Sequence, residues 1–201
     1  MRFIPPLKGR DKRARMSKKK TSADPFAPVR EATLAHRAKH GCSAWPYDNG
    51  PLLSVLAGAV DTKRILELGC ALGYTSLSFA NGAPKAKIDT IERDPEHAKL
   101  ARANFSAAGM EKRITVHEGD FASVVKTLEG PYDVAFFDGG IPVPAVHETL
   151  HKLLRPCGLL ITANLNHGGL ADTVLAALLD AKKWLTAFID EERETGISIK
   201  L

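Results

Sequence analysis

Residues 65–80, ILELGCALGYTSLSFA, constrain the fold of this chain more than any other segment. The segment begins as a short apolar strand, passes through a turn with two glycines and continues as a helix. A strand that feeds a helix through such a turn directs backbone N–H groups at a ligand. Gly69 lets a ligand approach the backbone closely, and Gly73 permits tight turning or close helix packing. The segment therefore predicts a ligand-binding strand–turn–helix unit.

The spacing of these glycines bears on the class of ligand. From Glu67 to Gly73 it is Glu-x-Gly-x-x-x-Gly, whereas dinucleotide-binding turns have Gly-x-Gly-x-x-Gly. The next strand, residues 87–92, ends in Glu92, which follows Gly69 by 23 residues. An acid at the end of the second strand can accept both hydroxyls of a ribose. The two elements together predict a nucleoside-containing ligand and disfavour the usual nicotinamide site.

Strands and helices alternate along the rest of the chain, which predicts an α/β fold with a parallel, doubly wound sheet. The last two strands follow each other too closely for a crossover, so we expect them to be antiparallel. Asp138 and Asn164 follow buried strands and belong at the same edge as Gly69 and Glu92. The expected strands are 64–68, 87–92, 114–117, 132–137, 158–163, 185–189 and 196–200, and the expected helices are 29–39, 52–60, 75–80, 95–108, 121–128, 144–154 and 170–181.

Several short motifs resemble, in order, the class I S-adenosylmethionine (SAM)-dependent methyltransferases, and in particular the catechol and caffeoyl-CoA O-methyltransferase family. They are LELG (66–69), GYTSL (73–77), IE (91–92), GD (119–120) and YDVAFFD (132–138), within a resemblance that spans roughly residues 50–201. The resemblance implies a Rossmann-like fold with seven strands in the order 3-2-1-4-5-7-6, strand seven reversed, and helices on both faces. The cofactor-binding residues that it implies are Glu67, Gly69, Gly73, Tyr74, Thr75, Glu92, Asp120 and Asp138.

Each part of SAM has an expected partner under this resemblance. Thr75 and the N–H groups of the turn take its carboxylate, and Glu67 faces its amine. Glu92 takes the ribose, and Asp120 borders the adenine. The implied reaction is methyl transfer to the hydroxyl of a small molecule.

The chain departs from the family at the metal site. The family binds a divalent cation through an Asp after strand four and an Asp-Asn pair after strand five. Asp138 and Asn164 match, but Ala163 replaces the middle acid, and the family's Lys after the strand-four Asp is absent. A hard cation needs several oxygen ligands, preferably charged. We therefore expect a metal-independent enzyme, with Asp138 and Asn164 as ligands only if a residual site survives.

A hydroxyl acceptor benefits from a general base, and His167 in the loop after strand five is the candidate. His147 and His151 share one helical face, which predicts that both are solvated. His40, Trp45 and Tyr47 either line an acceptor pocket or pack a loop with their rings.

The charge of the chain is concentrated at its N-terminus. Residues 1–20 carry nine Lys or Arg and one Asp, so their net charge is +8. Because the whole chain has a net charge of +5, the remaining residues sum to −3. We expect residues 1–28 to be a basic, disordered tail and 29–201 to be the methyltransferase domain; a start at Met16 would remove half of the cluster. The tail is the one segment whose charge suits nucleic acid or anionic lipid.

Composition limits the remaining choices. With 44% hydrophobic residues, no apolar run of membrane-spanning length and no apolar leader, the chain is expected to be globular and not membrane-bound. Three scattered cysteines without metal-ligand spacing favour a reducing cytoplasm. The sequence leaves open whether the protein forms a homodimer. Two other functions also stay open: a non-catalytic SAM- or partner-binding protein, and a nicotinamide-dependent reductase, which lacks its third glycine and a Tyr-x-x-x-Lys pair here.

Overall fold

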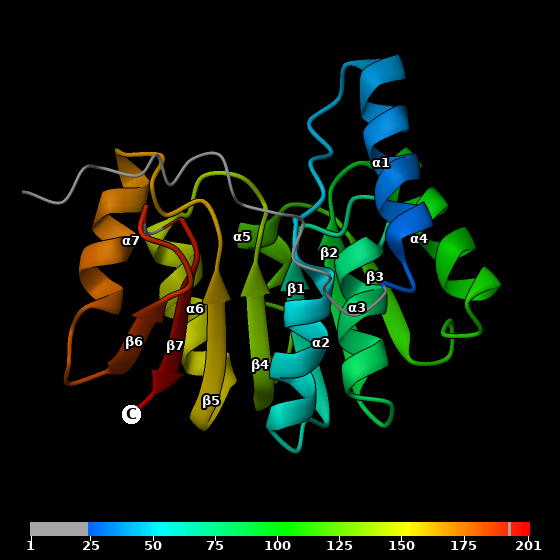
Figure 1. Cartoon of the computed structure of the whole chain (residues 1–201). Helices are drawn as coiled ribbons and strands as arrows, with labels where there is room; N and C mark the ends of the chain where they lie inside the picture. Colours follow the sequence, from blue (N-terminus) through cyan, green and yellow to red (C-terminus); the bar gives the residue numbers. More distant parts are fainter. Residues whose placement is uncertain (1–23, 193) are drawn as a thin grey trace, which may run out of the picture.

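The computed structural model describes residues 24–192 and 194–201, which form one seven-stranded sheet in the order β3-β2-β1-β4-β5-β7-β6 (Figure 1). The pairs β1–β2, β2–β3, β1–β4 and β4–β5 are parallel, whereas β7 runs antiparallel to both β5 and β6. The predicted strand order and the reversed strand seven are therefore confirmed. The strands are β1 (Arg64–Leu68), β2 (Lys87–Glu92), β3 (Ile114–Glu118), β4 (Tyr132–Phe137), β5 (Leu154–Thr162), β6 (Trp184–Phe188) and β7 (Gly196–Lys200).

Helices cover both faces of the sheet, as expected. Apolar side chains of α2, α3 and α4 pack on one face, and those of α5, α6 and α7 pack on the other. The first helix, α1, lies beside α4 at the carboxyl ends of the parallel strands (Figure 1). The helices are α1 (Ala27–His40), α2 (Gly50–Ala59), α3 (Tyr74–Gly82), α4 (Pro95–Ala107), α5 (Phe121–Val124), α6 (Pro144–Leu153) and α7 (Leu170–Leu178).

Strand β1 at the centre shows how the sequence produces this layering. Successive side chains of a strand point to opposite faces. Ile65 belongs to the core on the α2–α4 side, and Leu66 and Leu68 belong to the core on the α5–α7 side. Alternation places Glu67 on the same side as Ile65, where it lies completely buried beneath α3. A buried carboxylate is costly unless it is partnered, so its position indicates a functional site.

Three elements differ from their predicted bounds by more than two residues. Helix α5 ends at Val124 instead of residue 128, α7 ends at Leu178 instead of residue 181, and β5 begins at Leu154 instead of residue 158. The early start of β5 reflects the pairing of Leu154 with Tyr132 of β4, and the Lys200 ammonium donates to the Leu154 carbonyl at 2.7 Å. The pairing with β4 is irregular there, and Cys157 has a φ of 57°.

Contacts with the domain begin before the expected boundary at residue 28. The Tyr74 hydroxyl donates to Asp24 Oδ2 at 2.5 Å, and the Phe26 ring packs against the core. The basic segment itself, residues 1–20, lies outside the described residues. In the part of the chain that is described, no helix combines the length and apolarity needed to cross a membrane.

Candidate cofactor and active site

The turn between β1 and α3 depends on the conformations of its two glycines. Gly69 has a φ of +103°, and its N–H donates to the Ile91 carbonyl at 3.1 Å. A Cβ there would lie 2.8 Å from the Asp138 carbonyl oxygen, and a Cβ on Gly73, with φ +93°, would overlap the Phe105 ring of α4. Both glycines are thus required by the packing of the protein itself. The predicted packing role of Gly73 is confirmed. Gly69 lies between the ends of β2 and β4, where it contacts Ile91 and Asp138.

Glu92 at the end of β2 fixes this turn from the neighbouring strand. One carboxylate oxygen accepts the Ala71 N–H at 2.8 Å, and the other accepts the Asp94 N–H at 2.9 Å. The Glu92 side chain is 10% exposed. Each carboxylate oxygen has a second acceptor site, so the group can brace the turn and still accept hydroxyl donors.

Glu67 is the most deeply buried acid of the site, with no exposed surface. Its Oε2 accepts the Ser76 hydroxyl and, at 2.6 Å, the Thr90 hydroxyl. Its Oε1 is buried without any hydrogen-bond partner among the described residues. Burial raises the pKa of Glu67, and the charge of Glu92 adds to this effect. An unpaired carboxylate oxygen in a dry interior is suited to a cationic donor.

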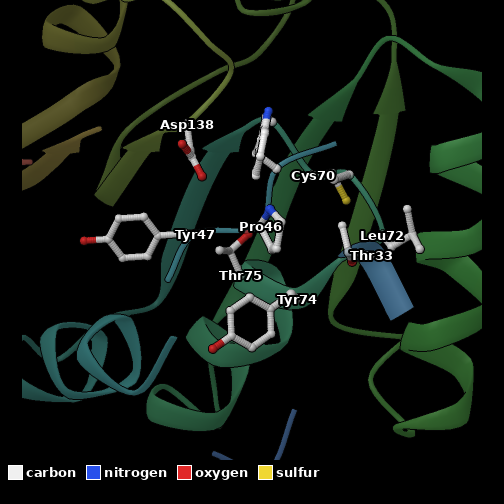
Figure 2. Close-up of a pocket in the computed structure, with 11 residues that line it drawn as sticks. Thr33, Pro46, Tyr47, Cys70, Leu72, Tyr74, Thr75 and Asp138 are labelled. Carbon is white, nitrogen blue, oxygen red and sulfur yellow. The ribbon is translucent and has the colours of Figure 1, made fainter. Parts of the chain in front are cut away.

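A small pocket forms where this turn meets the loop between α1 and α2 (Figure 2). Tyr47 of that loop packs edge-on against Phe136, with 5.4 Å between ring centroids, and burial raises its pKa. The space left in the pocket is about 10 Å³, which holds about one water molecule. The lining residues are Thr33, Trp45, Pro46, Tyr47, Gly69, Cys70, Ala71, Leu72, Tyr74, Thr75 and Asp138.

The aromatic residues around the pocket have different orientations. In Figure 2 the Tyr74 ring points away from Asp138; its hydroxyl accepts the Gly50 N–H at 3.1 Å in addition to its bond with Asp24. Trp45 is 63% exposed and has the Arg37 guanidinium 3.4 Å from its ring centroid. His40, considered with Trp45 and Tyr47 as an acceptor-pocket residue, is exposed and stacks on His36, and it is absent from the pocket lining.

Asp138 and Asn164 meet at the ends of β4 and β5, as their sequence positions predict. Asn164 Nδ2 donates to Asp138 Oδ1 at 3.2 Å and to the Gly140 carbonyl at 3.2 Å. Burial raises the pKa of Asp138 to about 8, and the charge of Glu67 contributes to this rise. Ala163, which directly precedes Asn164, is 3% exposed and has only a methyl side chain, so it supplies no further oxygen ligand. One carboxylate and one amide do not fit the oxygen-rich shell of a hard dication.

Asp120 and His167 lie away from the pocket lining. Asp120 is exposed and caps α5, where its Oδ1 accepts the Ser123 N–H at 3.0 Å. The Ser123 hydroxyl holds the pKa of Asp120 below its usual value. His167 is exposed in the loop between β5 and α7, three residues after Asn164. Among the described residues, the hydrogen bond from Asn164 is the one that joins a side chain of this loop to Asp138.

The prediction that His147 and His151 are solvated is wrong for His147. Its side chain is buried beside Phe137, with Nε2 at 3.3 Å from the Thr162 hydroxyl. Burial lowers the pKa of His147 to about 4, so the ring is neutral. His151 is half-buried against the Trp184 ring. The face that these residues share packs on the sheet because Val146 and Leu150 accompany them.

Sequence reasoning missed the residues that support Glu67. Thr90 lies directly opposite Glu67 in the parallel pairing of β1 with β2, and its hydroxyl reaches the same carboxylate as Ser76. The parallel register, once written out, identifies Thr90. Ser76 follows from its position in the first turn of α3, above the end of β1.

Comparisons with known proteins agree with this geometry. The model of the O-methyltransferase family matches residues 17–183, so the chain belongs to that family. A catechol O-methyltransferase from Mycobacterium tuberculosis is 32% identical over 123 residues, covering 60% of this chain and 56% of the relative. A catechol O-methyltransferase from Niastella koreensis is 30% identical over 143 residues, covering 68% of this chain and 64% of the relative. The chain thus matches less than two thirds of the length of either relative.

A solved structure extends the likeness across nearly the whole fold. The O-methyltransferase TomG from Streptomyces achromogenes, determined in complex with SAM, superposes with a TM-score of 0.75 at 22% identity. The superposition covers 92% of this chain and 93% of TomG. At this identity the likeness establishes the class I methyltransferase fold.

Proposed function

We propose that this protein is a SAM-dependent O-methyltransferase that acts on the hydroxyl of a small molecule. The observation that carries the proposal is the buried Glu67 carboxylate, whose Oε1 has no partner among the described residues, beside the turn that Glu92 braces. A cationic amine and a ribose are the two groups that these acids would satisfy. SAM contains both, and the solved relative TomG binds it.

The roles of individual residues follow from this cofactor. Thr75 and the N–H groups of the turn would hold the carboxylate of SAM, and Glu67 its ammonium group. Glu92 would accept the ribose hydroxyls, and Asp120 would border the adenine. SAM supplies a methyl group already activated by its sulfonium, so the protein contributes mainly by positioning the acceptor in line.

Cofactor binding requires the loop of residues 41–49 to move. The present space of about 10 Å³ is far below the several hundred Å³ of a typical cofactor pocket, roughly 300–1,000 Å³. Pro46 and Tyr47 lie between Asp138 and Thr75 in Figure 2, and Trp45 also lines the pocket. Their displacement would open the turn without disturbing the strands that hold Glu67 and Glu92.

We further propose that transfer proceeds without a divalent metal, with His167 as general base. The donor set of Asp138 and Asn164 supports metal independence, because Ala163 offers no second carboxylate. The base assignment rests on the loop of His167, which reaches Asp138 through Asn164. The free cysteines, one of them exposed, support a cytoplasmic location. A homodimer and nucleic-acid binding by the basic tail remain predictions.

The test combines binding with turnover. Calorimetry on the full chain should give a single SAM site and no heat with NAD; binding of NAD alone would support a reductase. Methyl-labelled SAM with a panel of phenols should then give labelled product in the presence of EDTA. SAM binding with no turnover on any phenol would indicate a non-catalytic SAM-binding protein, and turnover that collapses in EDTA and returns with Mg²⁺ would refute metal independence.

A further inference from the structure

Three metal-ligating side chains meet outside the site described above, where α1 contacts α4. They are His36 of α1, Cys42 of the following loop and His97 of α4. One ligand atom from each lies within 4.8 Å of the other two. His36 and Cys42 are half-buried, and His97 is 5% exposed. No other group of this kind occurs in residues 24–192 and 194–201.

Local structure explains how the sequence brings these residues together. Gly41 ends α1 in the left-handed conformation, with φ 64°, and its N–H donates to the Arg37 carbonyl at 2.8 Å. This reversal brings Cys42 back toward His36. His97 lies in the first turn of α4, which Asp94 caps by accepting its backbone N–H at 3.3 Å. The His36 and His97 rings then meet edge to face, with centroids 5.2 Å apart.

The surroundings of His97 suit a metal ligand. Its Nδ1 lies 3.9 Å from Glu92 Oε1, and its Nε2 lies 3.9 Å from Asp94 Oδ2. Both distances exceed that of a hydrogen bond, and neither ring nitrogen donates to or accepts from another described residue, although the side chain is almost completely buried. A ligating histidine commonly has one nitrogen on the metal and the other oriented by a carboxylate. Whichever ring nitrogen of His97 binds the metal, the other faces a carboxylate, of Glu92 or of Asp94.

We propose that His36, Cys42 and His97 form a binding site for a borderline-soft divalent cation of the zinc type, with the fourth position left to water or an external ligand. One thiolate and two imidazoles favour Zn²⁺ or Co²⁺ over Mg²⁺ and Ca²⁺, which prefer oxygen. Tetrahedral Zn²⁺ with bonds of about 2.0–2.3 Å needs donors roughly 3.3–3.6 Å apart, so ligand atoms that lie up to 4.8 Å apart must approach one another by up to about 1.5 Å. Binding replaces the thiol proton of Cys42 with the metal, and that proton is released to solvent.

This site is separate from the position at which the family binds its cation. It uses none of Asp138, Ala163 and Asn164, and it lies at α1 and α4 instead of at the ends of β4 and β5. A metal there would clamp the start of the loop that fills the pocket to the helix that follows Glu92. The inference is independent of the proposed function, because it concerns metal binding alone.

Cobalt provides the direct probe. Tag-free full-length protein, reduced and stripped with chelator, is titrated with Co²⁺ while its absorption is recorded, and Zn²⁺ is then added. We expect one equivalent of Co²⁺ to give a thiolate-to-cobalt charge-transfer band together with tetrahedral d–d bands, and Zn²⁺ to remove both. Absence of a charge-transfer band at saturating Co²⁺ would refute the proposal.

Matched variants locate the site. Cys42→Ser should abolish the charge-transfer band and weaken Zn²⁺ binding, measured by competition with a chromophoric chelator, by at least about 100-fold. Cys157→Ser removes an exposed free cysteine and should leave both readouts unchanged, as should Asp138→Asn. His97→Gln should also lose the band; since His97 is buried, its variant is compared only if circular dichroism matches the wild type. Unchanged binding in Cys42→Ser, or loss in Asp138→Asn, would assign the metal to other ligands.

Discussion

Replacement of Glu92 by alanine should affect both the turn that this carboxylate braces and the ribose binding that we propose for it. In the protein alone, its two oxygens accept the N–H groups of Ala71 and Asp94 at 2.8 and 2.9 Å. In the proposed complex the same oxygens also accept the ribose hydroxyls of SAM. The variant Glu92→Ala should therefore lower both the stability of the fold and the affinity for SAM.

The two effects differ in size. A hydrogen bond to a charged group contributes about 1.5–3 kcal/mol, and two such bonds are lost in the folded protein. Because water can enter the space left by the side chain, we expect the free energy of unfolding to fall by roughly 2–4 kcal/mol. Loss of the ribose acceptor should weaken SAM binding by roughly 1–3 kcal/mol, or about 5- to 150-fold.

A neighbouring glutamate provides the control. Glu118 lies opposite Glu92 in the pairing of β2 with β3, but its side chain is 46% exposed and forms an ion pair with Arg102. Glu118→Ala should cost at most about 1 kcal/mol and leave SAM binding unchanged. Urea denaturation measures the stabilities, and calorimetry measures SAM binding under conditions where both variants are folded. If Glu92→Ala is destabilised yet binds SAM with wild-type affinity, the carboxylate only braces the turn and the ribose assignment is wrong.

Three further predictions address other parts of the structure. The pKa of His147 falls from 6.5 to about 4 on folding, so the unfolded state takes up the proton first and stability is lost as the pH drops from about 6.5 to 4. His147→Asn should therefore lose up to roughly 3 kcal/mol less of its free energy of unfolding between these pH values than the wild type does. Urea denaturation at several pH values measures this, and the same dependence of stability on pH in both proteins would contradict the prediction. Ala163→Asp should raise Mg²⁺ affinity at least about tenfold by calorimetry, and equal affinity would show that the pocket does not match the family's. Gly73→Ala should lower the free energy of unfolding by about 2 kcal/mol or more, because φ is +93° and a Cβ overlaps Phe105; a wild-type melting temperature would refute that packing role.

The sequence predicted the sheet because its signals are local and repeated. Alternation of strands and helices implies parallel pairing, and the short final connection implies the antiparallel pair. Glu67, Gly69 and Glu92 lie together at the carboxyl ends of β1 and β2, as predicted, since parallel strands bring these ends to one edge of the sheet. Asp138 and Asn164 are in contact for the same reason.

Side-chain orientation was less accessible from the sequence. The position of His147 on α6 identifies a helical face, but only the packing against Phe137 and Thr162 shows that this face is buried. The Asp120 carboxylate follows β3 as expected, yet it caps α5, because a short helix after a strand presents free N–H groups to the nearest acid.

Contacts that depend on how the segment before β1 docks on the sheet and on α4 could not be derived from spacing along the chain. The loop of residues 41–49 has no periodic pattern that predicts its course over the turn at Gly69. His36 and Cys42 are close in sequence, but His97 joins them only because α1 docks on α4. Spacing along the chain therefore gives no metal-binding motif, and the cluster is recognised only in three dimensions.

Because Ala163 stands where the family has its second acid, the reaction should depend more strongly on how readily the acceptor hydroxyl loses its proton. A phenol with a pKa near 10 costs roughly 4 kcal/mol to ionise at pH 7, a cost that a bound dication would lower and that His167 can meet only in part. Turnover by the wild type should therefore rise steeply as the pKa of the acceptor falls. A series of substituted phenols, assayed with labelled SAM in EDTA, gives this slope, and Ala163→Asp with Mg²⁺ should give a shallower one. Equal slopes for the two proteins would mean that deprotonation does not limit transfer, and the argument for a compensating general base would fail.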